Sequence, residues 1–371
     1  MGTAIRCFVV VAAACVLFGV NVSGAPDAMR VHVIDVGQGA ATLVEFPCAA
    51  ILIDTGGERF PAAPWLPAQL NSTTRLMDYL RKFFAGRPDL KNQLALLVLS
   101  HPHLDHTRGV ADVVREFTPR SVVHNGQSTG SGFEGQRIAR DYAKDAGVLR
   151  WYVLERNIPK STGLTNDAID PVDCTPVNPQ IRALWGQVEN DAKWDPEEFH
   201  DENNHSVVLR IDYDQASVLF TGDLEEASNP GTLAGIERLV QAYQGNGLLN
   251  TDVYHVGHHG SHNGTTPALL TAISPEIAVM PVGPACNRGD FSAWTHKHPR
   301  AVTVNELESA VTGTRTPRTV SVFPSFSAAP VSRTETKGIY ATGWDGNIVL
   351  EGRPDGSWSA VSLGGPPACL K

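Results

Sequence analysis

The sequence contains no block rich in lysine or arginine. Its 39 acidic residues outnumber its 30 basic ones, which gives a formal net charge of −9. A continuous basic face that could wrap duplex DNA is therefore not expected. A nucleic-acid substrate is not excluded, because bound metal ions would supply positive charge locally. Hydrophobic residues make up 42% of the chain, as is typical of a globular protein.

Long apolar runs are also scarce. The single prominent one, from Cys7 to Val20, has about 14 uncharged residues and is shorter than the ~20 needed to span a bilayer as a helix. Arg6 precedes it and a small, polar segment follows it, so residues 1–25 are predicted to be a cleaved secretory signal. An uncleaved membrane anchor is the alternative. With the signal removed, we expect a secreted or periplasmic protein without stable membrane association.

Cysteine is rare, and two of the six cysteines fall in the predicted signal. The remaining ones are Cys48, Cys174, Cys286 and Cys369. None is spaced like a metal-binding pair. Their even number permits up to two disulfides in an exported protein, with three possible connectivities, and four buried thiols are the alternative.

Apolar runs of strand length alternate with amphipathic helical patterns, chiefly near 31–124 and near 206–350. The predicted strands are 31–34, 41–46, 50–53, 94–99, 121–123, 149–154, 206–212, 217–220, 253–256, 277–282, 320–323, 348–350 and 358–361. The stretch 157–203 is rich in Pro, Asn and Asp and is predicted to form a loop-rich insertion over one face. The pattern predicts an α/β domain over 27–365, with sheets sandwiched between helices.

Three histidines and one aspartate fall within six positions, directly after the buried strand predicted at 94–99. Imidazole and carboxylate groups are ligands of Zn²⁺ and related divalent ions. We expect His101 and His103 to bind one ion, and Asp105 and His106 to bind a second. Two ions about 3.5–4 Å apart would hold a hydroxide between them. The alternative is a solvated histidine-rich turn.

Two further strand ends carry candidate ligands. Asp223 ends a predicted hairpin as Thr-Gly-Asp and suits a carboxylate that bridges two ions, although a turn aspartate is the alternative. His258 and His259 follow the strand at 253–256 and are flanked by glycine. We expect His258 to bind the second ion, and His259 to be structural or to orient a phosphate or leaving group.

These blocks, together with Asp54-Thr-Gly, resemble the metallo-β-lactamase superfamily. Finer details resemble one branch, the hydrolase domain of the ComEC/Rec2 DNA-uptake proteins. Those details are Asp35-Val-Gly-Gln-Gly39, Phe220-Thr-Gly-Asp223, Val256-Gly-His258-His259-Gly-Ser261, His298-Pro299 and Gly346-Asn-Ile348. The resemblance covers about residues 30 to 362.

The resemblance implies an αββα sandwich of two mixed β-sheets flanked by helices, with a metal site on one rim between the sheets. The implied ligands are His101, His103, Asp105, His106, Asp223 and His258, and Asp54 would hold the histidine loop. Two divalent ions are expected. Imidazole-rich ligation favours zinc, while the oxygen ligands leave manganese open.

Two positions depart from the pattern of the branch. Ala40 stands where an aspartate usually follows Asp35-Val-Gly-Gln-Gly39, so a polar contact near the site is expected to be missing. Many members of the superfamily carry a separate histidine before the bridging aspartate, and His205 is the nearest candidate here. The resemblance to the branch does not require that histidine, so its role stays open.

Several other polar residues follow the histidine blocks and have two interpretations each. Ser261, Asn263 and Thr265 could donate hydrogen bonds to a phosphate, or could form a turn and a helix cap. His298 could lie near the substrate, or could end a loop.

These observations predict a secreted, binuclear metal-dependent hydrolase in which a metal-bridging hydroxide attacks the substrate. Asp105 and Asp223 are the predicted catalytic residues, because they would position that bridge. The resemblance favours a phosphodiester substrate, either a small molecule or a nucleic acid. The alternatives are a β-lactamase or lactonase-type amide or ester hydrolase and a non-catalytic metal-binding protein. No protein partner is inferred.

Overall fold

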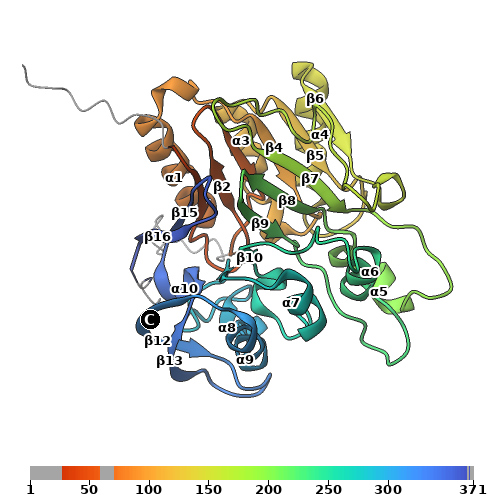
Figure 1. Cartoon of the computed structure of the whole chain (residues 1–371), viewed down its shortest axis with the longest axis vertical. Helices are drawn as coiled ribbons and strands as arrows, with labels where there is room; N and C mark the ends of the chain where they lie inside the picture. The colour runs from red at the N-terminus through yellow and green to blue at the C-terminus, as the bar shows by residue number, and fades with distance from the viewer. Residues whose placement is uncertain (1–26, 59–70, 366, 368–371) are drawn as a thin grey trace, which may run out of the picture.

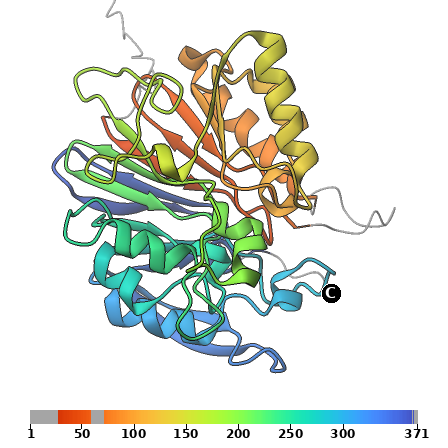
Figure 2. The same ribbon diagram turned by 90° about the vertical axis from the view of Figure 1, so that its right-hand side faces the viewer.

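Two β-sheets packed face to face form the centre of the molecule, and helices cover their outer faces (Figure 1 and Figure 2). The computed structural model describes residues 27–58, 71–365 and 367 of the chain. The first sheet has the strand order β16-β15-β1-β2-β3-β4-β5-β6, and the second has the order β14-β11-β10-β9-β8-β7. Each sheet combines parallel and antiparallel pairs, as predicted for the αββα sandwich.

The strands of the first sheet are β1 (Met29–Val33), β2 (Thr42–Glu45), β3 (Ala50–Ile53), β4 (Leu96–Leu99), β5 (Ser121–His124), β6 (Leu149–Tyr152), β15 (Ile348–Gly352) and β16 (Trp358–Leu363). Those of the second are β7 (Gln180–Trp185), β8 (Val208–Tyr213), β9 (Ala216–Phe220), β10 (Val253–His255), β11 (Ile277–Met280) and β14 (Ile339–Ala341). A separate ribbon pairs β12 (Thr314–Val322) with β13 (Val331–Lys337).

The α-helices are α1 (Ser72–Gly86), α2 (Leu104–Thr107), α3 (Val110–Phe117), α4 (Phe133–Ala146), α5 (Pro196–His200), α6 (Gly235–Ala242), α7 (Pro267–Ile273), α8 (Ala293–His296), α9 (Ala301–Ala310) and α10 (Thr342–Asp345). Short 3-10 helices include η4 (Glu202–His205) and η5 (Gly257–Gly260). Both lie at the functional site described below.

Alternation along the central strands divides their side chains between two cores. In β4, Leu96 and Val98 enter the core between the sheets, whereas Leu97 and Leu99 pack against the outer helices. A strand has a side-chain period of two, so a continuously apolar run of this length serves both faces of a covered sheet. Helices α1, α3 and α4 supply the outer core of the first sheet, and α6, α7 and α9 that of the second.

The strands predicted up to residue 124 are confirmed to within two residues at nearly every end. The two parts of the chain do not each form one sheet, because the strand at 348–350 belongs to the first sheet. There β15 pairs antiparallel with β1, and Leu350 lies opposite Val31. This pairing places Ile348 and Leu350 in the core between the sheets. Periodicity reveals a buried strand but not which strand lies beside it.

The stretch 157–203 contains more regular structure than loops alone. Its strand β7 extends the edge of the second sheet and pairs antiparallel with β8, and its helix α5 leads into η4. The predicted signal at 1–25 lies outside the described residues. Within the described ranges, no helix is both long and apolar enough to cross a membrane.

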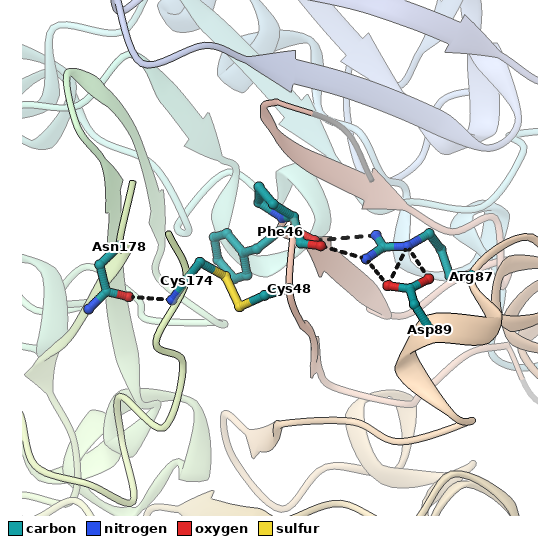
Figure 3. The surroundings of a disulfide bond; sticks show 7 residues. Phe46, Cys48, Arg87, Asp89, Cys174 and Asn178 are labelled. Atoms are coloured by element: carbon teal, nitrogen blue, oxygen red, sulfur yellow. Dashed lines mark hydrogen bonds and ion pairs between the residues drawn. A yellow bond between two sulfur atoms is a disulfide. The ribbon is translucent and has the colours of Figure 1, made fainter. Parts of the chain in front are cut away.

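One disulfide joins the turn after β2 to the segment that precedes β7. Figure 3 shows the bond between Cys48 and Cys174, with an S–S distance of 2.02 Å. This pair resolves one of the connectivities that the sequence leaves open. Cys286 is disulfide-bonded as well, whereas Cys369 lies outside the described residues.

Candidate metal centre

The histidine loop follows β4 and is held by the aspartate that ends β3. Asp54 accepts hydrogen bonds from the backbone N–H and the hydroxyl of Ser100, each at 2.8 Å. Its Oδ2 atom also lies 2.8 Å from Nδ1 of His106. An imidazole that donates from Nδ1 to a carboxylate keeps Nε2 free to bind a metal. Asp54 therefore fixes both the loop and the orientation of one predicted ligand.

Backbone contacts press the loop against the ends of the neighbouring strands. The N–H of Ala40 donates to the carbonyl of Asp105 at 3.0 Å. Gly56 lies so close to that carbonyl that a Cβ atom at position 56 would be 1.6 Å from its oxygen. Glycine is therefore required at position 56. Ala40 contributes its backbone to the loop, and its side chain is buried beside Asp54, His106 and Asp223.

His101 and His103 turn one nitrogen each toward the other. Nε2 of His101 lies 3.1 Å from Nδ1 of His103. The opposite nitrogen of His101 contacts the hydroxyls of Ser100 and Ser206, at 3.0 and 3.3 Å. Nε2 of His103 lies 3.5 Å from a carboxylate oxygen of Glu202, in η4. Each ring thus has one nitrogen held by a neighbour and one directed at the other ring.

Asp223 links this loop to the second sheet. It follows β9, and its N–H donates to the hydroxyl of Ser206 at 3.1 Å. Its Oδ2 atom lies 3.2 Å from Nε2 of His106 and 3.3 Å from Nε2 of His259. The carboxylate therefore lies between groups from the two sheets, which is the place expected of a bridging ligand.

The adjacent histidines of η5 point to different partners. His259 donates from Nδ1 to the carbonyl of Pro281 at 2.7 Å, and its Nε2 lies 3.4 Å from Asp105. Nδ1 of His258 instead lies 2.8 Å from Glu225. Both histidines have left-handed backbone angles, with φ of 45° and 53°. The structure brings His259, rather than the predicted His258, to the cluster.

The charges of the cluster shift its pKa values strongly. Burial alone would lower the pKa of His106, but the carboxylates of Asp223 and Asp54 raise it well above its usual value. Burial also opposes protonation of His259, whose pKa is nevertheless raised to about 10 by Asp223 and Asp105. The pKa of His101 is held well below the usual range by burial and by the neighbouring histidines. The carboxylates thus stabilise positive charge on His106 and His259, and they would stabilise a divalent metal ion at the same place.

The donor atoms fit divalent metal ions. Three groups of ligand atoms each lie within 4.8 Å of one another in the described chain. They are His101 with His106 and Asp223, Asp105 with His106 and His259, and His103 with Asp201 and Glu202. The first two share His106 and combine imidazoles with carboxylates, which is the donor chemistry of Zn²⁺.

His205 lies apart from this cluster. Its Nε2 atom donates to the carbonyl of Phe199 at 2.9 Å, and its Nδ1 atom accepts from the N–H of Val188 at 3.2 Å. Both nitrogens are therefore occupied by the backbone. Ser206, next in the chain, reaches the cluster instead.

The remaining polar residues mainly support turns. The hydroxyl of Ser261 donates to Asn263 at 2.6 Å, and Thr265 contacts the hydroxyl of Tyr254 at 3.1 Å. Both contacts are those of a structured turn. His298 accepts a hydrogen bond from the Gln38 side chain at 3.1 Å, and its ring centroid lies 5.6 Å from that of His258. His298 is thus packed beside the cluster, inside the protein.

Reasoning from the sequence missed Glu202 and Glu225 as neighbours of the site. Glu202 lies at the end of the stretch predicted to be loops, and Glu225 lies two residues beyond Asp223. Acidic residues close to predicted ligands were the available signal, since metal-binding histidines usually donate their second N–H to an oxygen.

Known proteins of one superfamily are similar to this chain. A family model described as the metallo-beta-lactamase superfamily matches residues 34–283. Recombination protein 2 of Haemophilus influenzae is 24% identical over 270 residues, 72% of this chain and 25% of that protein. ComE operon protein 3 of Bacillus subtilis is 25% identical over 320 residues, 82% of this chain and 36% of that protein. The chain thus spans about a quarter to a third of the length of these curated relatives.

Among solved structures, the metallo-beta-lactamase fold protein YhfI from Bacillus subtilis is similar, with 12% sequence identity and a TM-score of 0.44. The match covers 87% of this chain and 100% of that one.

Proposed function

Because the chain belongs to the metallo-beta-lactamase superfamily and to its ComEC/Rec2-like branch, we propose that it is a secreted metal-dependent hydrolase of phosphodiester bonds. The observation that carries the proposal is the convergence of imidazoles and carboxylates from both sheets on one rim. The converging residues are His101, His103, Asp105, His106, Asp223 and His259. Secretion rests on the signal-like residues 1–25.

We assign the ligands to two ions by their neighbours. His101 and His103 would hold one ion, and Asp105, His106 and His259 would hold the other, with Asp223 shared between them. The four imidazoles favour zinc. Bound divalent ions would lower the pKa of a water molecule toward neutrality and so provide the nucleophile.

The residues of the chain then have distinct tasks. Asp105 and Asp223 are the proposed catalytic residues, because their carboxylates would fix the ions at the reacting group. Asp54 is a positioning residue that orients His106 through Nδ1. Glu202 has the corresponding relation to His103. Such outer carboxylates typically change metal affinity or activity by about 10- to 100-fold when removed.

The choice of phosphodiester rests on the relatives. Their names refer to recombination and to the ComE operon. Recombination acts on nucleic acids, which are phosphodiesters. The net charge of −9 suits a small or single-stranded substrate better than a long duplex, which would need a basic face.

The direct test is hydrolysis of bis(p-nitrophenyl) phosphate by the apo, Zn²⁺-loaded and Mn²⁺-loaded protein. We expect turnover only with metal, and a loss of about 100-fold or more in His103→Ala. A chromogenic β-lactam measured in parallel separates the two substrate classes. Hydrolysis of the lactam alone would replace the proposal by an amide hydrolase. Bound metal without turnover of either substrate would leave a binding protein.

A further inference from the structure

Arg300 is a buried cation without a counter-charge. The residue is 7% exposed and immediately precedes α9. Its Nε and Nη1 atoms are buried and have no hydrogen-bond partner, and no carboxylate of the described residues lies within ion-pair distance. The guanidinium stacks on the ring of Phe326, 4.0 Å from the centroid. Stacking offsets only part of the lost hydration.

Other buried arginines in the structure are paired. Arg315 binds Asp345 at 2.7 Å, and Arg87 binds Glu45 at 2.5 Å. An arginine stays protonated in proteins, so burial cannot be relieved by loss of a proton. A charge that is desolvated and unpaired lowers stability. An anion that binds beside Arg300 would remove this cost.

Arg300 lies next to the turn that carries His259. The backbone N–H of Arg300 donates to the carbonyl of Gly260 at 2.9 Å, and this hydrogen bond anchors α9 to η5. His262 follows that turn, and its ring lies 5.2 Å from that of Phe326. Burial and the positive charges of Arg300 and His258 lower the pKa of His262. Arg300, His262 and Phe326 thus form one group beside the turn that carries His259, a proposed metal ligand.

We propose that Arg300 and His262 form a subsite that binds a second phosphate group of the substrate, beside the one at the metal centre. This inference rests on the proposed phosphodiesterase function. A planar guanidinium can donate two parallel hydrogen bonds to phosphate oxygens. The imidazole of His262 can donate a further one, and Phe326 is 60% exposed, which leaves the edge of this group open to solvent. A substrate with two phosphates would thereby neutralise the buried charge.

The first test compares the p-nitrophenyl esters of thymidine 5′-phosphate with and without a 3′-phosphate. We expect the zinc-loaded protein to show a KM about 10- to 100-fold lower for the ester with the second phosphate. In Arg300→Met the two KM values should fall within about twofold of each other. The matched control is Arg333→Met, which removes an arginine that is paired with Glu308 on α9 and should keep the preference. A preference that persists in Arg300→Met, or is absent from the unaltered protein, overturns the proposal.

The second test does not depend on turnover, so failure of the proposed function is distinguished from failure of the subsite. Thermal unfolding of zinc-loaded protein is followed with and without inorganic phosphate. Phosphate should raise the Tm of the unaltered protein more than that of Arg300→Met, and without phosphate Arg300→Met should be at least as stable. Arg315→Met is the contrast, because it removes one of the two arginines that bind the buried Asp345 and should lower the Tm without changing the response to phosphate. A purely structural Arg300 would behave as Arg315 does, with a lower Tm and an unchanged phosphate response.

Discussion

The adjacent histidines of η5 differ in what each can bind. Nε2 of His259 faces Asp105 and Asp223, while its Nδ1 is occupied by the carbonyl of Pro281. His258 has a carboxylate partner of its own in Glu225. One side chain is thus directed into the cluster and the other away from it, although both lie in a turn of the same conformation.

Replacement of each histidine by alanine tests this assignment. His259→Ala should reduce tightly bound zinc from about two ions per chain to about one, because three protein ligands are usual for such a site. His258→Ala should retain both ions. Metal content after gel filtration, measured by mass spectrometry, gives the answer. Loss of zinc in His258→Ala with full content in His259→Ala would return the ligand role to His258.

His124 gives a pH dependence of stability that is independent of the metal centre. Burial lowers the pKa of this residue from about 6.5 to about 3. Its Nδ1 atom accepts a hydrogen bond from the N–H of Gly126, and Nε2 is buried without a partner. Between those two values the unfolded chain binds a proton that the folded protein does not. The contribution of the neutral His124 to the free energy of unfolding is therefore fully present above pH 6.5, and it is lost as the pH decreases toward 3.

We expect this residue to remove about 2 to 3 kcal/mol of unfolding free energy between pH 7.5 and pH 4.5. His124→Gln, which does not titrate, should lose that much less over the same interval. Urea denaturation at the two pH values measures the difference. Parallel losses in the two proteins would mean that His124 is protonated in the folded state.

At the scale of elements, the first half of the chain could be predicted because its strands are buried on both faces. The runs that became β3 and β4 are continuously apolar and end in Asp54 and in the histidine loop. The same reasoning missed α9, whose sequence contains the β-branched residues Val302, Thr303 and Val304. Such residues have lower helix propensity, and packing against the second sheet decides the outcome.

The residue types of the metal centre could be predicted from the sequence, but not the direction in which every side chain points. Spacing identified the loop from His101 to His106 and the aspartate at 223, because each follows a strand that ends at the same rim. The choice between His258 and His259 depends on left-handed backbone angles, and non-glycine residues rarely adopt these. No periodic pattern in the sequence reports such angles.

The segment that follows β3 packs so closely against the histidine loop that one added methyl group at Gly56 should affect both stability and metal binding. Gly56→Ala would place a carbon atom 1.6 Å from the carbonyl oxygen of Asp105 and 2.2 Å from the N–H nitrogen of His106. The loop must move, so we expect a loss of about 2 to 4 kcal/mol in unfolding free energy together with weaker zinc binding.

Gly86→Ala is the matched control, because a Cβ atom at the end of α1 meets nothing within 4 Å. It should leave zinc binding intact and change stability by about 1 kcal/mol or less. Chemical denaturation and zinc titration of the two variants give the comparison. Equal behaviour of the two variants would show that the loop adapts to the added methyl group.

At the scale of the whole molecule, the metal centre depends on how the two sheets are held together. Asp54 and the histidine loop follow strands of the first sheet, whereas Asp223 and His259 follow strands of the second. The disulfide lies at the other end of β3 from Asp54, since Cys48 precedes that strand (Figure 3). It connects the first sheet to the segment that leads into β7. The core between the sheets thus has a covalent tie at the end remote from the metal ligands.

Replacement of both cysteines, Cys48→Ala with Cys174→Ala, should lower the unfolding free energy by about 3 to 5 kcal/mol. The reason is that the bond joins residues 126 positions apart, and closing so long a loop restricts the unfolded chain strongly. Zinc content of the folded protein should be unchanged, because the core and the ligand hydrogen bonds at the opposite rim remain. Guanidinium denaturation combined with metal analysis separates the two effects. An unchanged denaturation midpoint would argue that packing alone holds the sheets, whereas loss of zinc from the folded double variant would show that the bond also sets the distance between the two halves of the metal centre.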